Sequence, residues 1–312
     1  MKSPVALILF NRPDFTRKVF HRIAESKPKK LFLIADGPRE GNSDDIKKCE
    51  ETRKVVENIN WECDVYRNYS DTNLGCGIRP ATGISWVFQH VDRAIILEDD
   101  CLPDLSFFKF CNEILEKYKD DNRVMQINGD NFQLGEKRTK YSYYFSKYTL
   151  TWGWATWRRA WEYYDYQIKL WEEFQDTDFP LGITQNEGAS TYWRHQFNKA
   201  FQSESVSFWD YQWTFSFWVQ NGLSISPNET LVSNIGFGEN ATHTKSKSNP
   251  YAYRPLGKME FPLNHPPYMM ANKEADDFIA HQVSKQLRFI NNNNHSLLKK
   301  AAKKVLNKLG LR

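Results

Sequence analysis

The chain has 312 residues, which is enough to bury a sizeable core as one large domain or two. Its 42 Lys and Arg against 38 Asp and Glu leave a formal net charge of +4, which is too balanced to indicate a nucleic-acid-binding protein. The 11 Trp, 15 Tyr and 21 Phe suit a packed core as well as the recognition of sugars or bases, so composition alone assigns no ligand.

Two further features concern the cellular compartment. The five cysteines are odd in number and follow no metal-binding spacing, which is typical of reduced thiols in a cytosolic protein. Charges from Arg12 to Lys18 interrupt the early apolar run at residues 5–10, so we expect no signal peptide. No apolar run is long enough to span a bilayer. The sequence therefore predicts a soluble, cytoplasmic protein.

Over residues 1–130 two kinds of segment alternate. Strands are predicted at residues 5–10, which form a continuous apolar run, and at residues 30–37, 62–68, 93–97 and 123–129. Apolar residues at helical spacing predict helices between them, at residues 14–28, 44–59, 78–91 and 105–120. This alternation predicts an α/β fold with a mainly parallel central sheet and helices on both faces.

From about residue 140 the sequence is richer in aromatic residues and less regular. A further helix is predicted at residues 272–289. Residues 296–312 can form a basic amphipathic helix, which would bind an anionic membrane surface at the inner leaflet. A tail helix docked on the domain, or a disordered end, is the alternative.

Polar residues stand where three predicted strands end. Arg12 follows the first strand, Asp36 the second, and Glu98, Asp99 and Asp100 follow the strand at residues 93–97. In an open parallel sheet these ends meet at one edge, where ligands bind. Adjacent carboxylates repel one another and lose solvation near a protein interior, whereas Mg²⁺ and Mn²⁺ prefer oxygen ligands. We therefore predict a metal site here rather than a solvated acidic loop.

The segment "IILEDDCLPDLSFFKF" resembles the acidic motif of nucleotide-sugar-dependent glycosyltransferases with the GT-A fold. It is especially similar to the GlcNAc-transferase I family, and the chain is also similar to bacterial glycosyltransferase-like proteins. Other segments match that family in the same order over residues 4–245, namely "LFNRP", "IADG", "TWGWATWRRAW", "FWDYQW" and "SNIGFGENATHT". The resemblance implies a GT-A catalytic domain at residues 1–250 and a C-terminal extension at 251–312. Within the domain, residues 1–130 would bind the nucleotide sugar and 131–250 the acceptor.

The resemblance also implies roles for single residues. Asp100 would touch Mn²⁺ or Mg²⁺ directly, with His243 as a further metal ligand, and Asp210 would be the catalytic base. The donor would be a nucleotide sugar, with UDP-GlcNAc as the first choice, and it would contact Phe10, Arg12, Asp36, Glu98 and Asp99.

Arg79 lies in "NLGCGIRPATG", a Gly-rich loop that enters a predicted helix. Free backbone N–H groups at such a helix start suit an anion. Arg79 is therefore a candidate to contact the donor diphosphate, and an ordinary surface arginine is an equal alternative.

Asp210 is one of few acids in a strongly apolar segment, "SFWDYQWTFSFW". Desolvation there would raise its pKa and make it a better base, whereas the alternative is a helix N-cap. Gly153 between two tryptophans predicts a turn that exposes at least one ring. We expect acceptor binding by Trp152, Trp154 and Trp209, with Trp154 stacked on a sugar face, against the alternative that these rings fill the core.

The function predicted from the sequence is a metal-dependent, inverting glycosyltransferase. It would transfer a sugar to a glycan or lipid-linked acceptor in bacterial surface polysaccharide synthesis, with no nucleic-acid partner. Two other classes remain open at this point. One is a metal-dependent nucleotidyltransferase or phosphohydrolase, and the other is a non-catalytic carbohydrate-binding protein.

Overall fold

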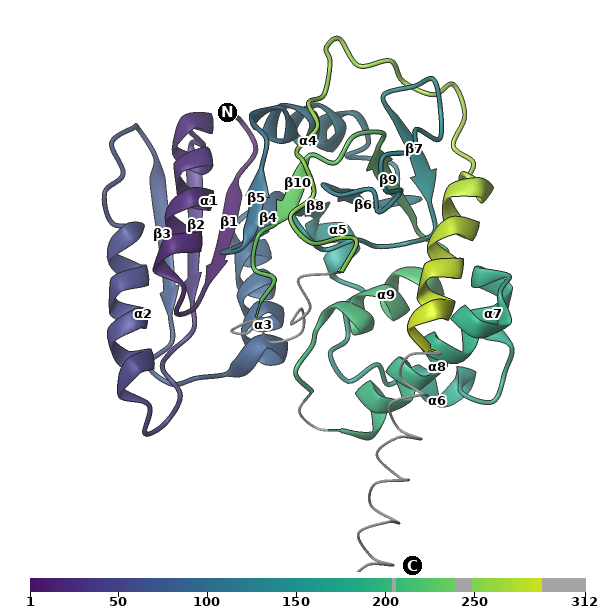
Figure 1. Cartoon of the computed structure of the whole chain (residues 1–312), viewed down its shortest axis with the longest axis horizontal. Helices are drawn as coiled ribbons and strands as arrows, with labels where there is room; N and C mark the ends of the chain where they lie inside the picture. The colour runs from purple at the N-terminus through teal and green to yellow at the C-terminus, as the bar shows by residue number, and fades with distance from the viewer. Residues whose placement is uncertain (204–205, 239–248, 288–312) are drawn as a thin grey trace, which may run out of the picture.

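A computed structural model describes residues 1–203, 206–238 and 249–287 (Figure 1). In this part of the chain the central element is an 8-stranded sheet with the order β3-β2-β1-β4-β8-β6-β9-β7. Strand pairs β3-β2, β2-β1, β1-β4 and β6-β9 are parallel, whereas β8 and β7 run antiparallel to their neighbours. The fold is therefore α/β with a mixed, mostly parallel sheet. The strands are β1 Val5–Leu9, β2 Lys30–Ala35, β3 Asp64–Tyr69, β4 Arg93–Glu98, β6 Val124–Asn128, β7 Tyr143–Ser146, β8 Trp154–Trp157 and β9 Leu223–Pro227.

The elements predicted for residues 1–130 are confirmed, with ends that shift by a few residues. The four helices of this half are α1 Pro13–Ser26, α2 Ser43–Val55, α3 Gly75–His90 and α4 Leu105–Lys117. Asn42 and Asp104 cap α2 and α4 with side-chain oxygens that accept backbone N–H groups, and Pro13 begins α1, where its missing N–H costs nothing.

Helices cover both faces of the sheet, as the alternation of the sequence predicts (Figure 1). Alternate residues of β1 point to opposite faces. Leu7 packs into one apolar cluster with Phe20 of α1 and Ile114 of α4. Ile8 packs into the other with Ile84 of α3 and the aromatic residues of the second half. Because β1 is buried on both faces, its sequence is a continuous apolar run.

The second half contributes short elements that the sequence does not delimit. Its helices are α5 Arg158–Trp161, α6 Trp171–Phe174, α7 Phe179–Thr184, α8 Glu187–Gln202 and α9 Asp210–Val219. A small two-stranded sheet pairs β10 (Val232–Asn234) antiparallel with β5 (Cys101–Pro103), so that Asn234 lies opposite Cys101. This pairing brings a late segment of the chain to the residues that follow Asp100.

The described part of the C-terminal extension packs on the domain. Ala271 bridges to Phe145 of β7, and Asp276 accepts hydrogen bonds from the Ser146 hydroxyl (2.5 Å) and the Lys147 N–H (3.0 Å). The helix predicted at 272–289 is present at residues 273–287 and lies beside α7 and α8 in Figure 1. The predicted tail helix at 296–312 lies outside the described residues. No described helix has the length and apolar character needed to cross a membrane.

Candidate active site

The carboxyl ends of β1, β2 and β4 form one edge of the sheet. The register pairs Leu9 with Ala35 and Ile8 with Glu98, so the residues that follow these strands are neighbours. The prediction that the three polar strand ends converge is therefore confirmed.

At this edge Arg12 faces the acidic residues. Its guanidinium donates a hydrogen bond to Asp100 Oδ2 at 2.7 Å, and the same nitrogen lies 3.5 Å from Asp99 Oδ1. The Phe10 N–H donates to Asp99 Oδ2 at 3.2 Å. Asp99 and Asp100 are buried, and Glu98 is half-buried. One arginine thus faces three adjacent carboxylates.

This single positive charge does not compensate the acidic residues. Burial raises the pKa of Glu98, and the charges of Asp100, Asp99 and Asp210 raise it further. Burial also raises the pKa of Asp99, although Arg12 opposes the rise. A site whose carboxylates resist ionisation lacks positive charge, and a bound cation would supply it.

We expect the protein without metal to lose stability as the pH rises from about 4.5 to about 8. In this range folded Glu98 keeps a proton that the unfolded chain has released, so the folded state binds more protons and its stability falls with rising pH. The measurement is the melting temperature against pH in EDTA. Glu98→Gln should flatten the fall, and Glu50→Gln at an exposed position should not. A melting temperature that rises across this range, or equal slopes in the variants, would contradict the account.

Asp210 joins this edge from the second half of the chain. It is the first residue of α9 and is partly exposed, and its charge is close enough to raise the pKa of Glu98. Trp209 rather than Asp210 occupies the N-cap position of α9, without a side-chain cap bond. Asp210 is therefore not the N-cap, and an acid in the first turn is favoured by the helix dipole.

The residues at this edge could bind a divalent cation together with substrate phosphates, but they do not enclose such an ion by themselves. No group of three or more His, Cys, Asp or Glu side chains in the described residues is arranged to enclose a metal ion. The predicted ligand His243 lies outside those residues. A Mg²⁺ or Mn²⁺ ion held by one or two carboxylates together with substrate phosphates needs no such enclosure. Asp99 and Asp100, which are buried and adjacent in the chain, fit that mode of binding.

Gly236, which the sequence does not indicate as a site residue, lies against Asp100. A Cβ atom at this position would stand 2.1 Å from Asp100 Oδ2 and 2.7 Å from its Cγ, so only glycine fits. The backbone N–H of Ile235 donates to the Asp100 carbonyl oxygen at 2.8 Å, which fixes the approach of the segment after β10. The segment thereby packs directly against the Asp100 carboxylate.

Gly236→Ala should weaken Mn²⁺ binding in the presence of UDP by about 10- to 100-fold, because the added methyl group displaces the Asp100 carboxylate. The measurement is a calorimetric titration with Mn²⁺. Gly182→Ala is the control, since nothing lies within 4 Å of its added Cβ. Unchanged Mn²⁺ affinity in the Gly236 variant would show that Asp100 does not hold the ion.

Asp36 already has partners from its own chain. Its carboxylate accepts hydrogen bonds from the backbone N–H groups of Gly37, Leu74 and Gly75 at 2.9 Å and from the Asn73 side chain at 3.0 Å. The anion at the start of α3 is therefore Asp36 itself, which corrects the expectation that this helix start offers free N–H groups to a ligand. A contact of Asp36 with the nucleoside stays a prediction.

The structure also corrects the placement of Arg79. Its side chain is buried and donates to the Ala35 carbonyl oxygen at 3.1 Å, to the Asn68 carbonyl oxygen, and to Asn68 Oδ1 at 2.9 Å. It joins the ends of β2 and β3 and is neither a diphosphate ligand at the surface nor a plain surface arginine. A guanidinium can satisfy several strand-end carbonyls at once, which explains its burial.

Of the three tryptophans predicted to bind the acceptor, two are buried in the core and one is half-buried. Trp154 is 1% exposed and Trp209 is 4% exposed, and their rings stack on each other at 5.6 Å. Trp154 begins β8 and faces α9, so both rings belong to the core and the predicted sugar contact of these two residues is wrong. Trp152 is half-buried and packs edge-on against Phe132 and Phe237. An acceptor contact of Trp152 stays a prediction.

Two residues near this edge were not identified from the sequence. Arg39 lies over the Phe10 ring at 5.8 Å and pairs with Asp45, which also binds the Asn11 amide. Asp130 follows β6, which runs in the same direction as β4; it is buried, and its Oδ2 has no hydrogen-bond partner. Arg39 lies in the loop four residues after the end of β2, and Asp130 follows β6 two residues after its end, so both stand near strand ends, which is the signal that could have found them.

No protein-family model matches this chain, and no curated protein matches its sequence. Among solved structures it is similar to S. aureus TarS 1–349, with a TM-score of 0.34 and 11% identity over 51% of this chain and 47% of that one. It is also similar to mouse xyloside xylosyltransferase 1, with a TM-score of 0.37 and 9% identity over 72% and 84% of the two chains. A third similar structure is 4-diphosphocytidyl-2C-methyl-D-erythritol synthase from Anaerococcus prevotii. Its TM-score is 0.34, with 10% identity over 72% of this chain and 88% of that one. The chain spans about half the length of the TarS fragment. Likeness at this level assigns no function.

Proposed function

We propose that this protein is a metal-dependent glycosyltransferase that uses a nucleotide-sugar donor. The proposal depends mainly on one observation, that the charge of Asp210 is near enough to the acidic strand end to raise the pKa of Glu98. Asp210 comes from the second half of the chain, yet its charge acts on Glu98 at the end of β4. A transferase needs a group for the donor phosphates and a group for the acceptor at neighbouring positions, and this edge offers a candidate for each.

The donor side consists of Arg12, Asp99 and Asp100. Asp99 and Asp100 would hold the divalent ion, which supplies positive charge to the nucleoside diphosphate as it leaves. Arg12, which pairs with Asp100 at 2.7 Å, would turn part of its charge to the diphosphate when the ion takes the carboxylate. Phe10, with Arg39 over its ring, would contact the nucleoside. UDP-GlcNAc remains our first choice of donor.

We assign Asp210 and the half-buried Trp152 to the acceptor side. An acceptor hydroxyl is a weak nucleophile, and its proton must be removed as the bond to the sugar forms. Asp210 would accept that proton. A base on the face opposite the leaving diphosphate leads to inversion at the sugar carbon, so inversion depends on this assignment. A lipid-linked acceptor, and membrane binding by residues 296–312, stay predictions.

Thermal-shift titrations with UDP-, GDP-, CMP- and dTDP-sugars test donor binding. A ligand that binds only the folded state raises the melting temperature by mass action. We expect a rise with one nucleotide class, in Mn²⁺ and not in EDTA. Equal shifts with free sugars, independent of metal and nucleotide, would instead favour a non-catalytic carbohydrate-binding protein.

A further inference from the structure

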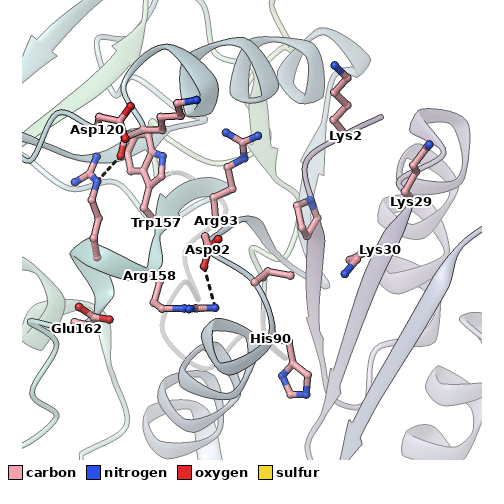
Figure 2. A pocket seen from close by; sticks show the side chains of 14 residues that line it. Lys2, Lys29, Lys30, His90, Asp92, Arg93, Asp120, Trp157, Arg158 and Glu162 are labelled. Atoms are coloured by element: carbon pink, nitrogen blue, oxygen red, sulfur yellow. Dashed lines mark hydrogen bonds and ion pairs between the residues drawn. The ribbon is translucent and has the colours of Figure 1, made fainter.

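A cavity of about 730 Å³ lies at the opposite edge of the sheet from the acidic residues. Its walls are the segments that lead into β1, β2 and β4, together with the end of β8 and the loop after α4. Figure 2 shows Lys2, Lys29 and Lys30 on one side of the cavity, and Asp92, Arg93 and Arg158 on the other. The cavity is thus separate from the predicted active site.

The lining is strongly basic. It contains seven Lys and Arg side chains against three Asp and Glu, and His90 lies at its margin. Some of these charges are compensated locally. Arg93 and Lys119 both bond to Glu116, at 2.7 and 2.8 Å, and Arg158 lies 3.0 Å from Asp92.

Lys2, Lys29 and Lys30 are different, because none of them has a carboxylate within ion-pair distance among the described residues. The fold itself brings them together. The Lys29 N–H donates to the Met1 carbonyl oxygen at 3.4 Å, which places the segment before β1 beside the start of β2. Lys2 and Lys29 are exposed and Lys30 is half-exposed, with its ammonium 6.0 Å from the Tyr66 ring. Three like charges thus line one side of the hollow, and none of them forms an ion pair within the described residues.

We propose that this cavity is a second binding site, for a phosphate-bearing ligand. Its volume lies in the range of small-molecule sites, about 300–1,000 Å³. Lysines bind phosphate as point charges, and one multivalent phosphate group can meet several ammonium groups at once. Arg93 also lines the cavity, and its planar guanidinium can bind the phosphate once the ligand competes with Glu116. The phosphate can belong to a soluble molecule or to a lipid headgroup. The site does not depend on the proposed transferase function.

The test is a calorimetric titration of the full chain with pyrophosphate in EDTA, which removes any metal-dependent binding at the acidic edge. The triple variant Lys2→Ala, Lys29→Ala, Lys30→Ala should bind at least about tenfold more weakly, because three charge-assisted contacts are lost. The control triple Lys18→Ala, Lys47→Ala, Lys54→Ala removes the same charge from exposed positions of α1 and α2 and should bind as the wild type does. Because all of these lysines are at least partly exposed, the melting temperatures of both triple variants should match that of the wild type. The single variant Lys29→Glu checks the weakening of pyrophosphate binding independently.

Vesicle flotation identifies the source of the phosphate. Wild-type binding to phosphatidylglycerol vesicles over phosphatidylcholine vesicles, lost in the cavity triple and kept in the control triple, would assign a lipid headgroup. Pyrophosphate binding without vesicle binding would assign a soluble ligand. The proposal is overturned if the wild type binds neither probe, or if the two triple variants weaken binding equally, since net charge alone would then explain the effect.

Discussion

Asp100→Ala is expected to abolish Mn²⁺-dependent binding of UDP and all turnover while the protein stays folded. Asp100 is buried at the end of β4 and is the acidic residue closest to Arg12, at 2.7 Å. Its loss removes the ligand that the ion needs beside the donor phosphates. Folding should survive, because the change relieves repulsion within the cluster and Arg12 keeps Asp99 at 3.5 Å.

The matched control is Asp71→Ala, an exposed acid in the loop after β3. It removes one negative charge from the same half of the chain and should leave UDP binding unchanged. The measurements are calorimetry with UDP in Mn²⁺ and in EDTA, and donor turnover. Near-normal activity of the Asp100 variant in Mn²⁺ would show that the acidic strand end does not hold a catalytic metal.

Asp210→Asn is expected to lower the turnover number by about 10²-fold or more and to leave donor affinity nearly unchanged. The amide keeps the size of the carboxyl group but cannot accept the acceptor proton. Removing this charge should also lower the pKa of Glu98, because Asp210 is one of the charges that raise it. Glu187→Gln is the control, since Glu187 is likewise the first residue of a helix, α8, and is exposed. Loss of donor binding with intact turnover would assign Asp210 to the nucleotide instead.

The strands of residues 1–130 and the acidic cluster at the end of β4 could be predicted because local pattern decides them. β1 and β4 are buried on both faces, so their apolar runs stand out, and the three acids after Leu97 break the run at the point where the strand ends. Polar groups at the ends of different strands meet when those strands are parallel neighbours, because their carboxyl ends then lie at the same edge of the sheet. That is why Arg12 and Asp100 could be brought together from sequence alone, as the 2.7 Å contact confirms.

Arg79 and Trp154 could not be placed in the same way. The partners of Arg79 are carbonyl oxygens at the ends of β2 and β3, and backbone acceptors leave no trace in the residue types. Trp154 looks like a turn residue beside Gly153, whose φ of 67° does mark a turn, but its ring packs on Trp209, a contact set by α9. Gly236 is similar, because its closeness to Asp100 follows from the β5–β10 pairing. Long-range packing decides these three positions.

The most direct test of the account is ³¹P NMR of the nucleotide-sugar donor identified by thermal shift, incubated with the protein and Mn²⁺. Cleavage of the bond between sugar and diphosphate is the step that the arrangement of Asp100, Arg12 and Asp210 would promote. We predict signals of the free nucleoside diphosphate, absent in EDTA and in the Asp100→Ala variant. A nucleoside monophosphate with sugar 1-phosphate would show that the phosphoanhydride is cleaved instead, as in a nucleotidyltransferase or phosphohydrolase, and would contradict the proposed function.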